Sequence, residues 1–138
     1  MNGGRYVLVD FRDTESRETL ESGLYRLLSA GYVPILAHAE RYRSLVGNRE
    51  LLRNFRQKGI ILQMDAGAPL GQFGFFTKLW AGRLLRAGLI DVICSDAHDT
   101  KGRPPNMAQA YELLRSKYGS EYADRLCRSN AEVLLRTD

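Results

Sequence analysis

Residues 60–95 read IILQMDAGAPLGQFGFFTKLWAGRLLRAGLIDVICS and carry the clearest signal of the fold class. The segment begins with an apolar run at 60–65 and ends with another at 89–95, both typical of strands buried on two faces. Between them, a glycine-rich segment at 67–74 leads into an apolar helical pattern at 75–87, which Gly88 closes. This order predicts two parallel strands joined by a crossover helix.

The same alternation continues toward the N-terminus. Strand-like runs occur at 5–11 (RYVLVDF) and 32–38 (YVPILAH). Leucines at helical spacing predict a helix over 15–30 that Gly31 ends, and Asn48 can cap a second helix that Gly59 ends. Helical patterns also run from residue 107 to the end, where SNAE (129–132) has the form of a capping box that opens a last helix. The sequence therefore predicts an α/β protein with about four parallel strands and crossover helices.

Length and composition exclude several classes of protein. The 138 residues suit one ordinary domain, with 44% hydrophobic and 26% charged residues. No run reaches the ~18 apolar residues of a membrane span, and the start shows no secretory signal. The net charge of +4 is scattered, and no helix has a basic stripe with interleaved aromatic residues, so we expect no nucleic-acid partner. With two cysteines in the chain, we expect a cytoplasmic protein.

Polar side chains follow the predicted strands. Asp10 ends the first strand, His38 ends the second, and Asp96 and His98 follow the fourth. In parallel α/β folds, chemistry collects at the carboxyl ends of the strands. Because both histidines of the chain lie there beside carboxylates, we predict a metal or catalytic role for them rather than a purely structural one.

Asp96 and His98 are two positions apart, so their side chains project to the same side if the strand continues to that point. A carboxylate oxygen and an imidazole nitrogen would then converge on one ion. Mixed ligation of this kind suits manganese, iron or zinc better than calcium or magnesium.

The glycine-rich segment has two interpretations. It matches neither the Walker pattern nor the dinucleotide fingerprint. Glycines before an apolar helix can expose backbone N–H groups that bind phosphate, or they can form a flexible turn, and the sequence favours neither. We expect Phe75, Phe76 and Trp80 to pack in the core or at an interface.

The cysteines do not fit a thiol nucleophile. Cysteine-dependent phosphatases carry an arginine six positions after the cysteine, whereas Thr100 follows Cys94 and Val133 follows Cys127 at that distance. An activated water is therefore the expected nucleophile if the site hydrolyses its substrate.

Five segments follow one another along the chain: AHAERY (37–42), QMDAGAPLGQFG (63–74), SDAH (95–98), RPP (103–105) and SNAEVL (129–134). Together they resemble the bacterial capsular and exopolysaccharide tyrosine phosphatases of the CpsB/CapC type. Those phosphatases belong to the polymerase-and-histidinol-phosphatase (PHP) superfamily, which has a distorted β/α barrel and a cluster of metals. The resemblance covers nearly the whole chain and implies a partial (β/α) barrel of the PHP type.

The resemblance also implies roles for individual residues. His38, Asp96 and His98 would be metal ligands, and Asp10 stands where the family has a bridging glutamate. Arg41 and one further arginine would hold the phosphate and stabilise charge in the transition state, a task that suits the guanidinium fork.

That second arginine is Arg103, and we add Gln63, Gly71 and Gly74 as candidate substrate-binding residues. The implied cofactor is a divalent metal, manganese before iron or zinc. The implied substrate is a phosphotyrosine protein, with a bacterial tyrosine kinase of polysaccharide export as a candidate.

The family opens with a His-x-His strand and further acidic ligands, to which nothing in residues 1–138 corresponds. A complete β/α barrel needs about 200 residues or more. We therefore expect 1–138 to be the C-terminal portion of a PHP-type phosphatase domain, with incomplete activity on its own. Four strands cannot close a barrel, so at least one sheet edge is expected to be open and could pair with a second copy of the chain.

Two other functions stay open at this point. One keeps the superfamily and changes the substrate to a small phosphomonoester such as histidinol phosphate. The other is a module without activity, an inactive PHP-like fragment that binds a protein partner.

Overall fold

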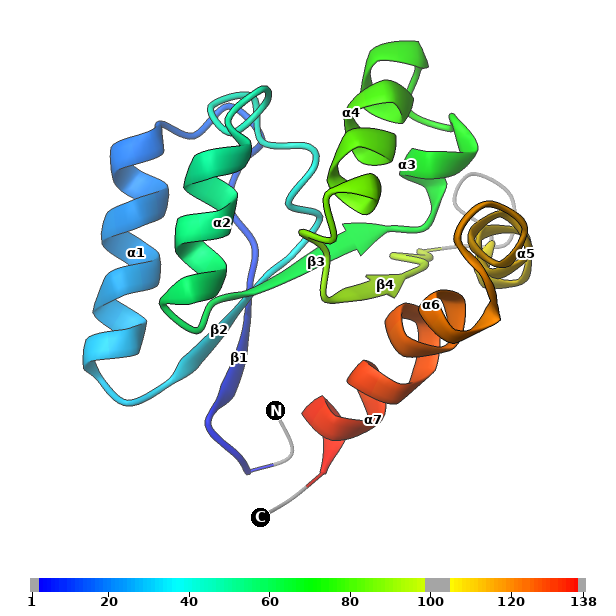
Figure 1. The fold of residues 1–138 in the computed structure, drawn as a ribbon. Helices are drawn as coiled ribbons and strands as arrows, with labels where there is room; N and C mark the ends of the chain where they lie inside the picture. Colours follow the sequence, from blue (N-terminus) through cyan, green and yellow to red (C-terminus); the bar gives the residue numbers. More distant parts are fainter. Residues whose placement is uncertain (1–2, 99–104, 137–138) are drawn as a thin grey trace.

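The computed structural model describes residues 3–98 and 105–136 and has an α/β fold (Figure 1). Its sheet contains four parallel strands, arranged side by side in their order along the chain. They are β1 (Tyr6–Val9), β2 (Val33–Leu36), β3 (Ile61–Asp65) and β4 (Val92–Cys94). The predicted fold class is confirmed.

Helices make the crossover connections between the strands. They are α1 (Arg17–Ser29) before β2, α2 (Arg49–Gln57) before β3, and α3 (Gly67–Leu70) and α4 (Phe75–Arg86) before β4. The chain continues through α5 (Met107–Tyr118), α6 (Ser120–Asp124), a π-helical segment (Arg125–Ser129) and α7 (Asn130–Leu135). Within the described ranges, no helix combines the length and the apolar character needed to cross a membrane.

Local sequence signals explain where α1 and α2 begin and end. The side chains of Ser16 and Asn48 each accept a hydrogen bond from the backbone N–H three residues later, at 3.1 and 3.0 Å. These bonds satisfy N–H groups that the first helical turn leaves without a partner. Gly31 and Gly59 follow the two helices with φ of +86° and +90°, a left-handed conformation that glycine adopts at little cost.

The predicted capping box at residues 129–132 is wrong. Ser129 has φ −61° and ψ −42°, which are helical angles, whereas an N-cap residue needs extended ones. The π-helical segment runs directly into α7, so no new helix starts at Ser129. The serine-to-glutamate spacing alone could not reveal that the preceding residues are already helical.

The aromatic residues of α4 divide between core and surface. Trp80 is 5% exposed and packs in the core, as expected. Phe75 and Phe76 are 68% and 84% exposed. The glycine-rich segment before them contains the short helix α3, which the sequence did not indicate.

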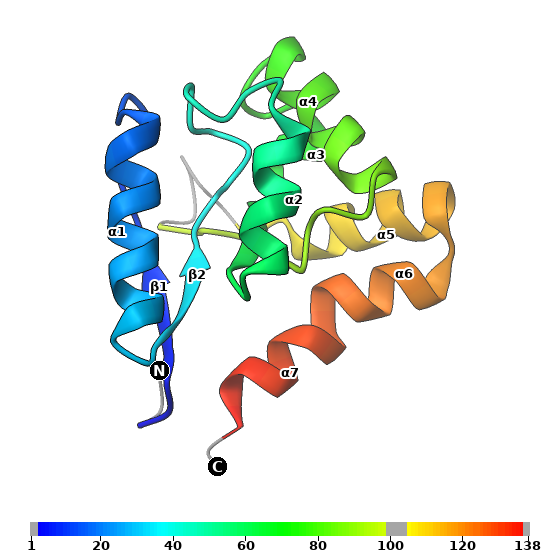
Figure 2. The same ribbon diagram turned by 60° about the vertical axis from the view of Figure 1, so that its left-hand side comes forward.

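The two faces of the sheet pack differently. On one face, Leu36 and Leu62 join a large core formed with α1, α2, α4 and α5. On the other face, Ile35 and Val92 form a small cluster with Leu134 of α7. Figure 2 shows α7 following α6 and running toward the strands β1 and β2.

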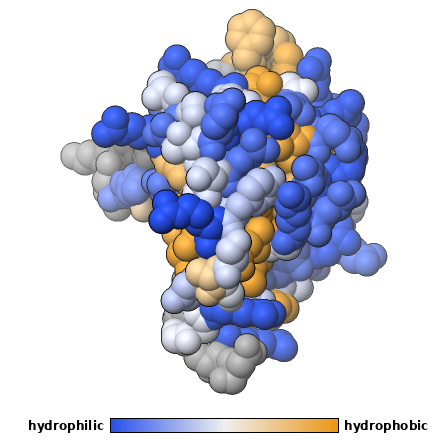
Figure 3. Space-filling view, turned by 90° about the vertical axis from the view of Figure 1, so that its left-hand side faces the viewer, coloured by the Kyte–Doolittle hydropathy of each residue, from blue (hydrophilic) through white to orange (hydrophobic). Residues whose placement is uncertain are grey.

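The strands β1 and β4 are the two edges of the sheet in the part of the chain that the structure describes. Leu8 of β1 lies in register with Ile35 of β2 but is 52% exposed. A space-filling view of the side on which α1 and β1 lie shows hydrophobic surface between hydrophilic areas (Figure 3).

Candidate active site

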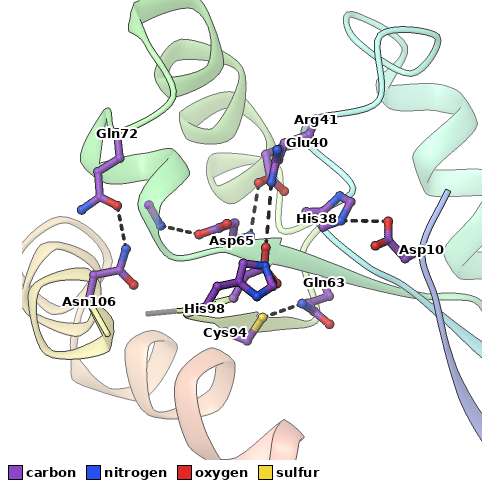
Figure 4. A network of polar contacts seen from close by, with 12 residues as sticks. Asp10, His38, Glu40, Arg41, Gln63, Asp65, Gln72, Cys94, His98 and Asn106 are labelled. Carbon is purple, nitrogen blue, oxygen red and sulfur yellow. Dashed lines mark hydrogen bonds and ion pairs between the residues drawn. The ribbon is translucent and has the colours of Figure 1, made fainter. Parts of the chain in front are cut away.

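The four predicted metal ligands lie at the carboxyl end of the parallel sheet, where Figure 4 shows Asp10, His38 and His98. Asp10 follows β1, His38 follows β2, Asp65 ends β3, and Asp96 and His98 follow β4. Because all four strands run in the same direction, these ends share one edge of the sheet. The structure thus brings the four predicted metal ligands to the same edge.

Two of these residues have an unusual backbone conformation. His38 has φ +35° and Asp96 has φ +45°, and they are the only non-glycine residues with positive φ in ranges 3–98 and 105–136. Such conformations cost about 1–3 kcal/mol each and concentrate at functional sites. Since β4 ends at Cys94, the premise that the strand continues through Asp96 to His98 is wrong, and a left-handed turn sets the direction of these side chains.

His38 and Asp10 form the first histidine–carboxylate pair. His38 Nε2 lies 3.0 Å from Asp10 Oδ1, which joins the ends of β1 and β2. The His38 side chain is 13% exposed, and its Nδ1 is buried without a hydrogen-bond partner among the described residues. Asp10 is 67% exposed at the side chain, so the pair opens to solvent on the carboxylate side.

Asp96 lies between a histidine and an arginine. Its Oδ1 is 3.7 Å from His98 Nε2, and its Oδ2 is 3.9 Å from Arg41 Nη1. The side chain of His98 is 62% exposed, whereas those of Asp96 and Arg41 are each 26% exposed. The Arg41 guanidinium also lies 4.9 Å from the centre of the Phe73 ring, which it covers in a cation–π contact.

The donors fit a divalent metal in their chemistry. Imidazole nitrogen and carboxylate oxygen are the ligand types that manganese, iron and zinc accept. Over the described ranges, however, no group of three or more His, Cys, Asp or Glu side chains is arranged to hold an ion. In those ranges Asp10, His38, Asp96 and His98 form two histidine–carboxylate pairs, and their role as metal ligands stays a prediction.

Glu40 and Asp65 form a buried polar link between β2 and β3. Glu40 is 1% exposed, and its Oε1 accepts a hydrogen bond from the Asp65 backbone N–H at 3.2 Å. Asp65 Oδ1 in turn accepts one from the Gly67 N–H at 2.8 Å. Burial raises the pKa of Glu40 to about 8. These contacts hold the loop after His38 against the end of β3.

Tyr42 supports His38 in a way that the sequence analysis missed. It is fully buried, and its hydroxyl accepts a hydrogen bond from the Phe11 backbone N–H at 3.2 Å. The centres of its ring and the His38 imidazole are 5.5 Å apart. Burial raises the pKa of Tyr42 to about 12, so its hydroxyl stays protonated. The only signal in the sequence is its place in the AHAERY segment.

Gln63, a predicted substrate-binding residue, points along the sheet. It is 8% exposed, and its Nε2 donates a hydrogen bond to Cys94 Sγ on the neighbouring strand. Burial raises the pKa of the Cys94 thiol to about 11. Both side chains lie beneath the sheet edge that carries the two pairs (Figure 4), and a substrate contact at Gln63 stays a prediction.

Gly71 and Gly74 shape the turn between α3 and α4. Their φ angles are +86° and +94°, and their backbone N–H groups donate to Ala68 and Gly71 carbonyls. These two N–H groups are thus engaged within the turn, and their role in substrate binding stays a prediction. The last predicted site residue, Arg103, lies outside the described residues.

The chain is similar to known proteins over nearly its whole length. The family model for capsular polysaccharide synthesis, CpsB/CapC, matches residues 1–136. Tyrosine-protein phosphatase YwqE of Bacillus subtilis is 36% identical over 136 residues, covering 99% of this chain and 53% of the relative. Tyrosine-protein phosphatase CpsB of Streptococcus pneumoniae is 32% identical over 140 residues, covering 98% of this chain and 58% of the relative.

The fold is also similar to that of a solved structure. It comes from work on YwqE from Bacillus subtilis and CpsB from Streptococcus pneumoniae, described as unique metal-dependent tyrosine phosphatases. It superposes with a TM-score of 0.88 at 36% identity, and the match covers 99% of this chain and 55% of that chain. The chain thus spans about half the length of the relatives it matches.

Proposed function

The chain belongs to the CpsB/CapC family of capsular polysaccharide synthesis, and on that basis we propose that it is part of a metal-dependent protein-tyrosine phosphatase that acts in capsule or exopolysaccharide regulation. The names of its relatives support a tyrosine phosphatase activity. In this proposal residues 1–138 form the C-terminal portion of a PHP-type phosphatase domain.

One observation carries the proposal. Two histidine–carboxylate pairs and Arg41 meet at the carboxyl end of a parallel sheet. Two of these residues, His38 and Asp96, are held in strained left-handed conformations. Backbone strain and charged groups gathered at one sheet edge are both features of active sites rather than of ordinary packing.

Arg41 is the phosphate-binding residue of this proposal. Its contacts with the Phe73 ring and with Asp96 limit the orientations of its guanidinium group. A guanidinium held in one orientation can donate two parallel hydrogen bonds to a phosphate and stabilise the charge of the transition state. Arg103 would contribute a second guanidinium group.

Asp10, His38, Asp96 and His98 are the ligands that this chain would contribute to a divalent metal, manganese before iron or zinc. A divalent metal at such a site supplies Lewis acidity and activates water for attack on phosphorus. Because the described residues offer two pairs and no group of three, we expect residues 1–138 alone to bind metal weakly and to have little phosphatase activity.

Metal binding tests the ligand assignment. We expect weak, saturable binding of manganese by the purified chain in equilibrium dialysis, and its loss in His38→Ala and in His98→Ala. Arg53→Ala is the matched control, because Arg53 pairs with Glu50 on the exposed face of α2. Manganese binding that is unchanged in both histidine variants would overturn the assignment.

Hydrolysis of an aryl phosphate tests the activity in the same preparations. We expect a low rate with added manganese. A robust rate that His98→Ala abolishes would show that residues 1–138 suffice for catalysis and would contradict the expected incompleteness.

The substrate proposed is a phosphotyrosine protein in the cytoplasm, with a tyrosine kinase of polysaccharide export as the candidate. A comparison of rates on a phosphotyrosine peptide and on histidinol phosphate separates this substrate from a small phosphomonoester. Faster hydrolysis of histidinol phosphate would contradict it.

A further inference from the structure

A pocket of about 470 Å³ opens beside the candidate active site. It lies between the loop that follows β2 and the first turns of α4, and Arg41 belongs to its lining. Pockets of roughly 300–1,000 Å³ are the usual size for small ligands.

Aromatic side chains form one wall of the pocket. Phe73, Phe76 and Trp80 line it, and they come from the turn before α4 and from its first two turns. Trp80 is buried, whereas Phe76 is largely exposed. Aromatic walls favour a flat apolar ligand, since rings pack against one another in stacked or edge-to-face geometry.

The ionisable groups of the pocket lie on the loop side. Arg41 and Arg43 line it together with the acidic residues Asp13 and Glu40. Arg41 is shared with the sheet edge, because its Nη1 lies 3.9 Å from Asp96 while its guanidinium covers Phe73. Arg41 therefore belongs both to the pocket lining and to the strand ends.

A buried hydrogen-bond donor in the pocket wall lacks an acceptor. Trp80 Nε1 is buried and has no partner among residues 3–98 and 105–136. Buried polar atoms of folded proteins are almost always hydrogen-bonded, so this donor points to an acceptor other than the described residues. Glu40 also lines the pocket, and its buried Oε2 likewise has no hydrogen-bond partner among those residues.

Resting on the proposed function, we propose that this pocket binds the aromatic ring of an aryl phosphate such as phosphotyrosine, while Arg41 holds the phosphate at the strand ends. The aromatic wall recognises the ring, and the arginine between pocket and sheet edge recognises the anion. The pocket therefore selects aryl phosphates over alkyl phosphates, which lack the ring.

Trp80 provides a direct readout, because it is the only tryptophan of the chain. Its fluorescence is followed while the purified chain is titrated with phenyl phosphate, glycerol phosphate or inorganic phosphate. We expect a saturable change with phenyl phosphate at concentrations where the other two ligands produce none.

Two neighbouring phenylalanines supply a variant and its control. Phe76→Ala removes a ring that lines the pocket, and its exposure means that the fold does not depend on it. We expect roughly 2- to 10-fold weaker binding of phenyl phosphate, the size of one aromatic contact. Phe75 is exposed on the same helix outside the pocket lining, so Phe75→Ala should bind phenyl phosphate as the unmodified chain does.

Equal affinity for phenyl phosphate and glycerol phosphate would overturn the proposal, as would equal effects of Phe76→Ala and Phe75→Ala. This equilibrium measurement needs no turnover. Ring-dependent binding in a chain that binds no manganese would sustain the pocket and count against the proposed function, whereas histidine-dependent manganese binding without ring-dependent binding of phenyl phosphate would do the reverse.

Discussion

His38 and Asp96 each combine a candidate metal-ligating side chain with a left-handed backbone. The parallel order of the strands allowed their position at one sheet edge to be predicted from the sequence, because each follows a recognisable apolar run. Their pairing with Asp10 and His98 depends on backbone angles just beyond the strand ends. No residue pattern in the chain indicates those angles, since neither position is a glycine.

The strain at His38 leads to a prediction about stability. A β-branched residue fits the left-handed region poorly, whereas asparagine tolerates it. We expect His38→Val to unfold in urea with a free energy about 1–2 kcal/mol lower than His38→Asn, both measured without metal. The same two substitutions at His98, which does not have a positive φ, serve as the control, and an equal difference at both positions would contradict the interpretation.

The geometry of Arg41 leads to a prediction about phosphate binding. Lysine keeps the charge but cannot donate two parallel hydrogen bonds. We expect Arg41→Lys to weaken binding of phenyl phosphate by about 10-fold, or roughly 1.4 kcal/mol, in the Trp80 fluorescence titration. Arg53→Lys on the exposed face of α2 is the control. Unchanged affinity in Arg41→Lys would mean that Arg41 acts as a simple charge.

Among the elements, strands and long helices were predictable and the short or irregular segments were not. The helices α1 and α2 each have a side-chain cap directly before the first residue and a glycine within two residues of the last one. Their ends could therefore be predicted from the sequence. The helix α3 begins with a glycine, contains a proline and is followed by Gly71, and these residues also suit a turn. The π-helical segment before α7 has ordinary helical composition, so only its hydrogen bonds distinguish it.

The packing of α7 against the sheet leads to a prediction at this scale. Leu134 contacts the small cluster around Ile35 and Val92, whereas the adjacent Leu135 is 50% exposed. We expect Leu134→Ala to lower the free energy of unfolding by about 2 kcal/mol, the lower end for a buried leucine. Leu135→Ala should change it by less than about 0.5 kcal/mol. Similar losses in both variants would show that α7 is not docked through Leu134.

For the molecule as a whole, the resemblance of five short segments to the CpsB/CapC type is confirmed by a family match over residues 1–136. The α/β fold with four parallel strands is confirmed, and the chain superposes on about half of a solved relative, whereas its place within a β/α barrel stays a prediction. Parallel strands that pair only with sequence neighbours have a simple order, which is why the topology followed from the sequence. The contacts among the candidate site residues join loops that are far apart in the sequence. The order of the strands alone therefore could not predict them.

The exposed β1 edge leads to a prediction about association. An unpaired strand edge with an exposed leucine is a site for pairing with another chain. We expect residues 1–138 to self-associate with increasing concentration in sedimentation experiments, and Leu8→Lys to shift the protein toward monomer. Leu79→Lys, at a 44% exposed leucine of α4, is the control. Equal effects of both lysine variants would assign the association to general hydrophobicity instead of the β1 edge.

The half-buried thiol of Cys94 beside the site has a consequence for how the chain responds to oxidants. Enzymes that attack phosphate with a cysteine depend on a thiolate, and peroxide silences them by converting it to sulfenic acid. Cys94 receives a hydrogen bond from Gln63, and its raised pKa keeps it protonated at neutral pH. Cys94 therefore offers little thiolate for peroxide to convert, so the off-switch of thiol-based enzymes is not expected at this side chain.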